Sequence, residues 1–167
     1  DLAVLYSAGM LAKYGNTAGV ISRLNLLVQT ANDAMSNSEV AITLNLIGAQ
    51  LTTYTEANLN GEALDALTGI TIPPSGCIVS TGCPDIVPLP QIAVEARALR
   101  ASVGADLVSL VRPYSYAAHG GNCGVGWVYQ GFTNVAFSSQ FGYSVVSDSL
   151  DPVTNFYCKN DTLAHEL

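Results

Sequence analysis

The sequence has few positive charges and no long hydrophobic run. Its 167 residues include six Lys and Arg, all isolated from one another, against 13 Asp and Glu, and the net charge is −7. Nucleic-acid surfaces need clustered Lys and Arg to neutralise phosphates, and anionic membranes attract the same residues. No apolar run reaches the roughly 18–20 residues of a membrane-spanning helix. We therefore expect no nucleic-acid partner and no membrane partner, and we assign the apolar residues, 49% of the chain, to a buried core.

The sequence also lacks an initiating Met, a signal-peptide pattern and any Cys-x-x-Cys pair. A first residue of Asp1 indicates a mature or recombinant product whose targeting segment has been removed. Four cysteines without metal-knuckle spacing favour two disulfides, with free thiols as the alternative. Disulfides form in oxidising compartments, so we expect a secreted or extracellular protein, with the periplasm and the cell surface as variants. The cysteines are Cys77, Cys83, Cys123 and Cys158.

Hydrophobic spacing predicts alternating strands and helices in the first part of the chain. Residues 2–7 are suited to a buried strand, and the spacing from Val20 to Met35 predicts a helix capped by Asn16 or Thr17. Residues 40–48 alternate as a strand with one face on the core would. The apolar residues of this alternation are Val40, Ile42, Leu44 and Leu46.

A second helix and strand are expected after a proline-rich, irregular stretch at 69–90. Residues 89–103 carry one apolar stripe and precede Gly104, which suits a helix C-terminus. Residues 105–111 are nearly all apolar, as in a strand covered on both faces. Residues 125–130 and 143–147 are short β-prone pieces in a glycine-rich region. The alternation predicts one α/β domain with a largely parallel sheet and right-handed crossovers.

The final residues, "TLAHEL" (162–167), contain the pattern with which a zinc-peptidase motif begins. In such sites the first His binds the metal and the Glu that follows polarises the attacking water. His165 and Glu166 stand in this order on a predicted helix, but a second His one turn later is missing. The alternative is a solvated His-Glu pair at a frayed terminus.

Other catalytic candidates are weaker. His119, the only other His, lies in a glycine-rich segment and is expected to be exposed. Cys123 with His119 as its base would make a nucleophile, but no cation adjoins it. The sequence has no Gly-x-Ser-x-Gly elbow, and "GGNCGVG" lacks the Lys-Ser/Thr ending of a phosphate loop.

Several motifs, taken in order, resemble the metzincin zinc peptidases, specifically their reprolysin-like (adamalysin-related) secreted branch. They are "LAVLYSAGM" (2–10), "GADLV" (104–108), "CGVGW" (123–127), "YSVVSDS" (143–149) and "AHEL" (164–167). The resemblance covers essentially the whole chain. It implies a metzincin N-terminal subdomain with a twisted, mostly parallel five-stranded sheet, one antiparallel edge strand beside the substrate cleft, and packed helices in a three-layer-like arrangement.

The resemblance also implies a function, that of a zinc-dependent endopeptidase acting on proteins or peptides through a metal-activated water. His165 is then the first zinc ligand and Glu166 the general base. The substrate-binding edge strand comprises Gly124, Val125, Gly126, Trp127, Val128 and Tyr129.

The family pattern continues with two more His, a Gly turn and a Met-turn, and none of these precedes Leu167. We therefore expect residues 1–167 to be a truncated catalytic domain that binds zinc weakly or not at all and does not cleave peptides. A deliberate truncation, a partial sequence and natural processing remain open as explanations. The alternative function is an inactive binding or assembly module that self-associates through the edge strand.

The expected positions of the cysteines suggest how they pair. Cys123 precedes the edge strand and Cys158 precedes the active-site helix, so a bridge between them would tie the cleft wall to the helix. Cys77 and Cys83 would close the proline-rich loop.

Overall fold

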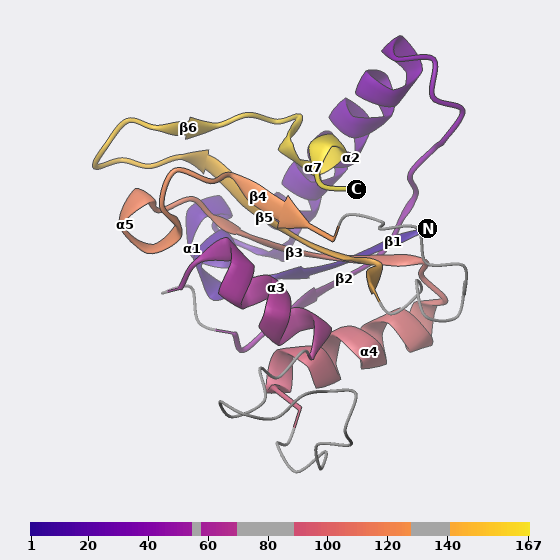
Figure 1. Cartoon of the computed structure of the whole chain (residues 1–167), viewed down its shortest axis with the longest axis horizontal. Coiled ribbons are helices and arrows are strands. Elements are labelled where there is room, and N and C mark those ends of the chain that lie inside the picture. Colours follow the sequence, from indigo (N-terminus) through magenta and orange to yellow (C-terminus); the bar gives the residue numbers. More distant parts are fainter. Residues whose placement is uncertain (55–57, 70–88, 128–140) are drawn as a thin grey trace, which may run out of the picture.

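The fold is given by a computed structural model, which describes residues 1–54, 58–69, 89–127 and 141–167 (Figure 1). Three predictions fall outside these residues. They are the irregular proline-rich stretch, the pairing of Cys77 with Cys83, and the strand positions Val128 and Tyr129. Within the described part of the chain, no helix is long and apolar enough to cross a membrane.

A mixed β-sheet forms the centre of the structure. Its strand order is β2-β1-β3-β5-β4, with neighbours parallel except for β4, which runs antiparallel to β5. A short strand, β6, pairs antiparallel with the end of β5. This confirms the predicted α/β class and the antiparallel edge strand. The strands are β1 (Leu2–Tyr6), β2 (Leu46–Leu51), β3 (Leu107–Pro113), β4 (Gly124–Gly126), β5 (Tyr143–Leu150) and β6 (Tyr157–Cys158).

Helices cover both faces of the sheet and bury a separate apolar core on each (Figure 1). The first core lies under α1 (Ala8–Tyr14), α2 (Thr17–Asn37) and α7 (Thr162–His165), and the second under α3 (Asn60–Thr68) and α4 (Gln91–Val103). The central strand β1 contributes alternately to the two. Leu2, Val4 and Tyr6 belong to the first core, whereas Ala3 and Leu5 belong to the second, as the two-residue period of a strand requires. All five residues of β1 are therefore buried.

The ends of the two long helices agree with the predictions. The Asn16 side chain accepts a hydrogen bond of 2.9 Å from the Gly19 amide at the start of α2. Gly104 follows α4 with φ +70°, a left-handed conformation that favours glycine. Asn16 thus marks where α2 begins, and Gly104 marks where α4 ends and the chain returns to the sheet.

The predicted strand at 40–48 is wrong in its position, because pairing with β1 begins only at Leu46. Val40 and Ile42 are 43% and 56% exposed. The C-terminal half of α2 extends beyond the sheet, and the following residues return along it (Figure 1). The Asn32 amide accepts from Leu44 N (2.7 Å) and donates to Leu44 O (3.0 Å). This side chain supplies the backbone hydrogen bonds that a neighbouring strand would otherwise provide, so the alternating segment stays outside the sheet.

A buried ion pair joins the sheet to α1 and α2 on the first face. Asp148, near the end of β5, accepts from Arg23 of α2 at 2.5 Å and from the Tyr14 hydroxyl of α1 at 2.6 Å. Burial alone would raise the pKa of Asp148, but the hydrogen bonds from Arg23, Tyr14 and Ser149 outweigh it and lower the pKa. Arg23 also donates to Asn160 at 2.7 Å, just before α7.

We predict that Asp148→Asn lowers the free energy of unfolding by about 3–5 kcal/mol, because it leaves the Arg23 charge buried without its partner. Urea denaturation of both proteins measures this difference. Asp33→Asn, at an exposed position on α2, is the matched control and should change stability by less than about 0.5 kcal/mol.

The same pair predicts a pH dependence. Because the folded protein lowers the pKa of Asp148, its stabilisation is present above the unfolded pKa of about 3.9 and is lost as the pH falls through the folded value. The stability difference between wild type and Asp148→Asn should be constant near neutral pH and shrink below about pH 4. A difference that persists unchanged in acid would contradict the role of the Asp148 charge.

Candidate active site

The short helix α7 is placed by contacts on both of its sides. Leu163 is 1% exposed and belongs to the first core, so it fixes which face of α7 points inward. Thr162 Oγ1 donates to Lys159 O at 2.8 Å, and Arg23 holds Asn160. Asp161 occupies the N-cap position but makes no side-chain capping bond. Packing and the Arg23 contact, rather than a capping side chain, therefore set where the helix begins.

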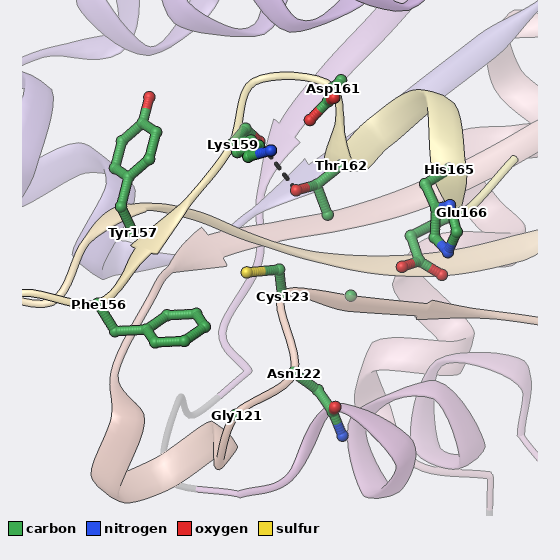
Figure 2. Close-up of a pocket in the computed structure, with 11 residues that line it drawn as sticks. Gly121, Asn122, Cys123, Phe156, Tyr157, Lys159, Asp161, Thr162, His165 and Glu166 are labelled. Atoms are coloured by element: carbon green, nitrogen blue, oxygen red, sulfur yellow. Dashed lines mark hydrogen bonds between the residues drawn. The ribbon is translucent and has the colours of Figure 1, made fainter.

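His165 and Glu166 lie at the end of α7, beside the edge strand β4 (Figure 2). The His165 side chain is exposed, whereas Glu166 is half-buried. Burial raises the pKa of the Glu166 carboxyl, and the charge of His165 and a backbone hydrogen bond from Gly126 counteract part of this rise. The protein environment thus favours the protonated form of Glu166, the predicted general base, more than water would.

The close approach of α7 to β4 requires two glycines. A Cβ on Gly124 would lie 2.6 Å from Glu166 Cγ, and a Cβ on Gly126 would lie 2.3 Å from the Glu166 carbonyl oxygen. Real Cβ atoms do not approach other heavy atoms so closely. The alternating glycines of "GVG" therefore leave the space into which Glu166 packs.

An open pocket of about 570 Å³ lies between β4, β6 and α7. Its walls come from the segment leading into β4, from the residues around β6 and from α7 itself (Figure 2). The lining residues are Gly121, Asn122, Cys123, Gly124, Phe156, Tyr157, Lys159, Asp161, Thr162, His165 and Glu166. The two residues predicted from the His-Glu motif and the first residue of the predicted edge strand thus border one cavity.

The predicted bridge between Cys123 and Cys158 is present, with a Cα–Cα distance of 5.3 Å. It joins the start of β4 to β6, and the Ser147 amide donates to Cys123 O at 2.7 Å on the other side. The bridge also excludes Cys123 as a nucleophile, a candidate that the sequence already disfavoured, because its sulfur carries no thiol.

The prediction that His119 is an exposed loop residue is also wrong. It ends the short helix α5 (Tyr116–His119) and is 1% exposed. Its Nδ1 lies 3.0 Å from Ser147 Oγ, and the Ser115 amide lies 3.3 Å from the same nitrogen. The imidazole can be buried because Ser147 of β5 supplies a polar partner for it. The glycine-rich sequence around His119 did not reveal this partner.

A buried polar network supports the segment before β4, and sequence reasoning missed it. Arg112, fully buried at the end of β3, donates to Asn60 Oδ1 at 2.7 Å, and Ser147 Oγ donates to the same oxygen at 3.1 Å. The amide nitrogen of Asn60 donates to Asn122 O at 2.9 Å. The sequence signal that could have revealed this network was Arg112, a lone Arg at the end of an apolar strand, because a buried guanidinium needs several hydrogen-bond acceptors.

Trp127, the last described residue of the predicted edge strand, points toward the second face of the sheet. Its indole Nε1 donates to Thr68 Oγ1 of α3 at 2.9 Å, and its ring packs edge-on against Phe141 with centroids 5.3 Å apart. Trp127 does not line the pocket, so its side chain anchors the strand to α3.

The donors available for a metal ion are few. Among residues 1–54, 58–69, 89–127 and 141–167, no three His, Cys, Asp or Glu side chains gather closely enough to hold one. His165 alone has the position and exposure of a first ligand, so these residues by themselves do not fit a complete catalytic zinc site.

Comparisons with known proteins give the family and the fold of the chain. The family model described as "Metallo-peptidase family M12B Reprolysin-like" matches residues 1–71 and 91–167. A solved structure described as "Structure of a chaperone-substrate complex" contains a similar chain, with a TM-score of 0.62 and 19% sequence identity. The match covers 99% of this chain and 24% of that one, and at this identity it shows a likeness of fold alone. No curated protein matches the sequence.

We predict that the Cys123–Cys158 bridge contributes roughly 3–4 kcal/mol to stability, because its sequence separation is 35 residues. The double variant Cys123→Ser, Cys158→Ser should lose this amount in urea denaturation. Thiol titration of the unfolded, unreduced wild type should find neither of these cysteines free. A reactive Cys123 or Cys158 in that titration would contradict the bridge.

We also predict that Gly126→Ala destabilises the protein by about 1–3 kcal/mol, because the new methyl group meets the main chain of Glu166. Gly121→Ala is the matched control, since a Cβ there has nothing within 4 Å. Thermal unfolding compares the two variants. Equal melting temperatures for them would mean that α7 does not pack against β4 as described.

Proposed function

Because the chain belongs to the reprolysin-like branch of metallopeptidase family M12B, we propose that it carries the substrate-binding edge and part of the catalytic centre of a secreted zinc-dependent endopeptidase. Residues 1–167 would form the N-terminal subdomain of one catalytic domain. The substrate would be a protein or peptide. The Cys123–Cys158 disulfide supports an extracellular site of action.

The observation that carries this proposal is the contact between Glu166 and the glycines of β4. It brings a carboxylate on a helix and the edge of a sheet to the same pocket. An extended peptide can pair with a sheet edge through its main chain, which orients a peptide bond regardless of side chains. A carboxylate beside that edge can accept a proton from a water molecule that attacks the peptide bond.

Three parts of this chain would have separate roles in peptide hydrolysis. The outer edge of β4, which ends the strand order of the described sheet, binds the substrate main chain. Glu166 takes a proton from the attacking water and passes it to the leaving amine, and its raised pKa makes the carboxylate a better proton acceptor near neutral pH. His165 would hold a zinc ion, which supplies Lewis-acid activation of the water when bound.

Zinc binding would need ligands beyond those of the described residues, which bring together one candidate, His165. A catalytic zinc site uses three protein ligands and a water. We propose that the other ligands come from chain outside residues 1–167, and that these residues alone do not cleave peptides.

The second candidate function is a binding or assembly module without catalysis. The position of β4 at the end of the sheet favours it, because an edge strand can pair with a second copy of the chain. Sedimentation of the whole protein that contains residues 1–167, over a range of concentrations, separates the two functions. Defined oligomers that form without proteolysis would support the module, whereas a concentration-independent monomer that cleaves peptides would exclude it.

For the whole protein that contains residues 1–167, we predict that Glu166→Gln lowers kcat by about 10²–10⁴-fold, because the amide cannot accept the proton from water. His165→Ala should abolish cleavage and reduce bound zinc. Glu39→Gln, an exposed change far from the pocket in sequence, is the matched control and should keep wild-type activity. Cleavage of a quenched fluorescent peptide and elemental analysis give the two measurements.

Two results would contradict the proposal. An active protein that is indifferent to Glu166→Gln would remove the general-base role. Stoichiometric zinc in residues 1–167 after dialysis would mean that the missing ligands lie within the chain after all.

A further inference from the structure

The sheet has a second end, opposite the one that borders the pocket. The strand order places β2 there, and among the described residues no strand lies on its outer side (Figure 1). Three residues of β2, namely Ile47, Gln50 and Leu51, are exposed to solvent. This edge takes no part in the candidate active site.

The main chain of β2 is paired with the sheet on one side. Thr52 N, directly after the strand, donates to Tyr6 O of β1 at 2.9 Å. Alternate residues of a strand turn their N–H and C=O groups to the same side, so those of Gln50 also face β1 and those of Ala49 and Leu51 face outward. Ala49 and Leu51 therefore offer two donors and two acceptors to an added strand.

Features that protect a sheet edge from pairing are scarce along β2. Charged side chains and Pro serve this purpose in many proteins, but residues 40–54 include neither. One bulge is present, at Ile47, yet the register with β1 is regular from Gly48 to Leu51. The regular part of the strand is thus uncharged and open to a partner.

The charge distribution favours a second copy of this chain as that partner. The net charge is −7, so two copies repel one another over most of their surfaces. The carboxylates hydrogen-bonded beside β2 lie before and after it, where Asp1 accepts from Asn45 (3.3 Å) and Glu95 from Thr53 (2.9 Å). Two identical strands can meet between these groups without opposing like charges. A partner recognised by opposite charge would find no complementary group along the strand.

Antiparallel pairing of two copies also matches their side chains. With Gln50 on the two-fold axis, Ala49 of each copy lies opposite Leu51 of the other, and the outward main-chain groups meet. A small residue then faces a large one on one side of the joined sheet, and Leu51, which is 43% exposed, becomes covered. On the other side the two Gln50 amides meet. Each amide carries donors and an acceptor, so the two can bond to one another.

We propose that the outer edge of β2 is a self-association surface, at which a second copy of the chain pairs antiparallel to form one continuous sheet with Gln50 on the two-fold axis. The surface lies at the far end of the sheet from β4, so the dimer leaves the pocket open and does not depend on the peptidase function. One short strand from each copy makes a small contact, and we expect a dissociation constant of about 1–100 μM.

The first test is sedimentation of the whole protein from about 1 to about 300 μM, where wild type should change from monomer to dimer. Leu51→Lys should raise the dissociation constant at least about tenfold, because it places a charge where the two edges meet. Val153→Lys adds the same charge in the turn between β5 and β6, at a position that is 86% exposed, and should dimerise as wild type does. Thermal unfolding checks that both variants are folded.

A second test locates the axis and does not depend on the folding of Leu51→Lys. Residues opposite one another in a non-hydrogen-bonded antiparallel pair have Cα atoms about 4.5 Å apart, a distance that a disulfide can span. Under mild oxidation, Gln50→Cys should therefore form a covalent dimer that a reducing gel dissociates. Wild type and Val153→Cys, treated in the same way, should remain monomers on the non-reducing gel.

Three results would overturn the proposal. Wild type that stays monomeric over this range would leave the β2 edge to a different partner or to none. A dimer that survives Leu51→Lys in a folded protein would place the contact elsewhere, for example at β4. A Gln50→Cys dimer that does not cross-link would exclude the proposed axis. Peptide cleavage by the same samples tests the proposed function separately.

Discussion

The guanidinium of Arg23 is the contact on which the geometry of the site depends. It binds Asp148 at the end of β5 and Asn160 just before α7, so one side chain of α2 fixes both ends of the connection that carries β6. A surface ion pair would contribute little, but Asp148 is buried and the Arg23 side chain nearly so. Loss of this contact would leave α7 held by Leu163 and its neighbours in the core, without a defined distance to β4.

The central elements of the fold could be predicted because their sequences repeat with a clear period. β1 is a continuous apolar run and the first part of β3 is nearly all apolar. α2 and α4 carry apolar stripes, and Asn16 and Gly104 mark a recognisable end of each. Helices α1 and α3 were missed, since seven and nine residues are too few for a helical period to stand out. The strand at 40–48 was misplaced because alternation cannot show whether a neighbouring strand or the Asn32 side chain satisfies the backbone.

The candidate site divides in a similar way. His165, Glu166 and the glycines of β4 belong to short motifs, so they could be recognised in the sequence. The burial of His119, the Asn60 network and the ring contact between Phe156 and Tyr114 depend on pairs more than 25 residues apart, and no local pattern encodes such pairs. Sequence reasoning therefore found the chemistry of the pocket but not the residues that shape it.

The Cys123–Cys158 bridge has a consequence for how a ligand would enter the pocket. Cys123 lines the pocket and is bonded to Cys158 of β6, so the segment that leads into β4 and the strand β6 are joined covalently and cannot separate there. Any widening has to come from tilting of α7 or from side-chain rotation at the rim. A cavity restrained in this way loses little conformational entropy when it is filled, and affinity then depends chiefly on how well the ligand matches a shape that already exists.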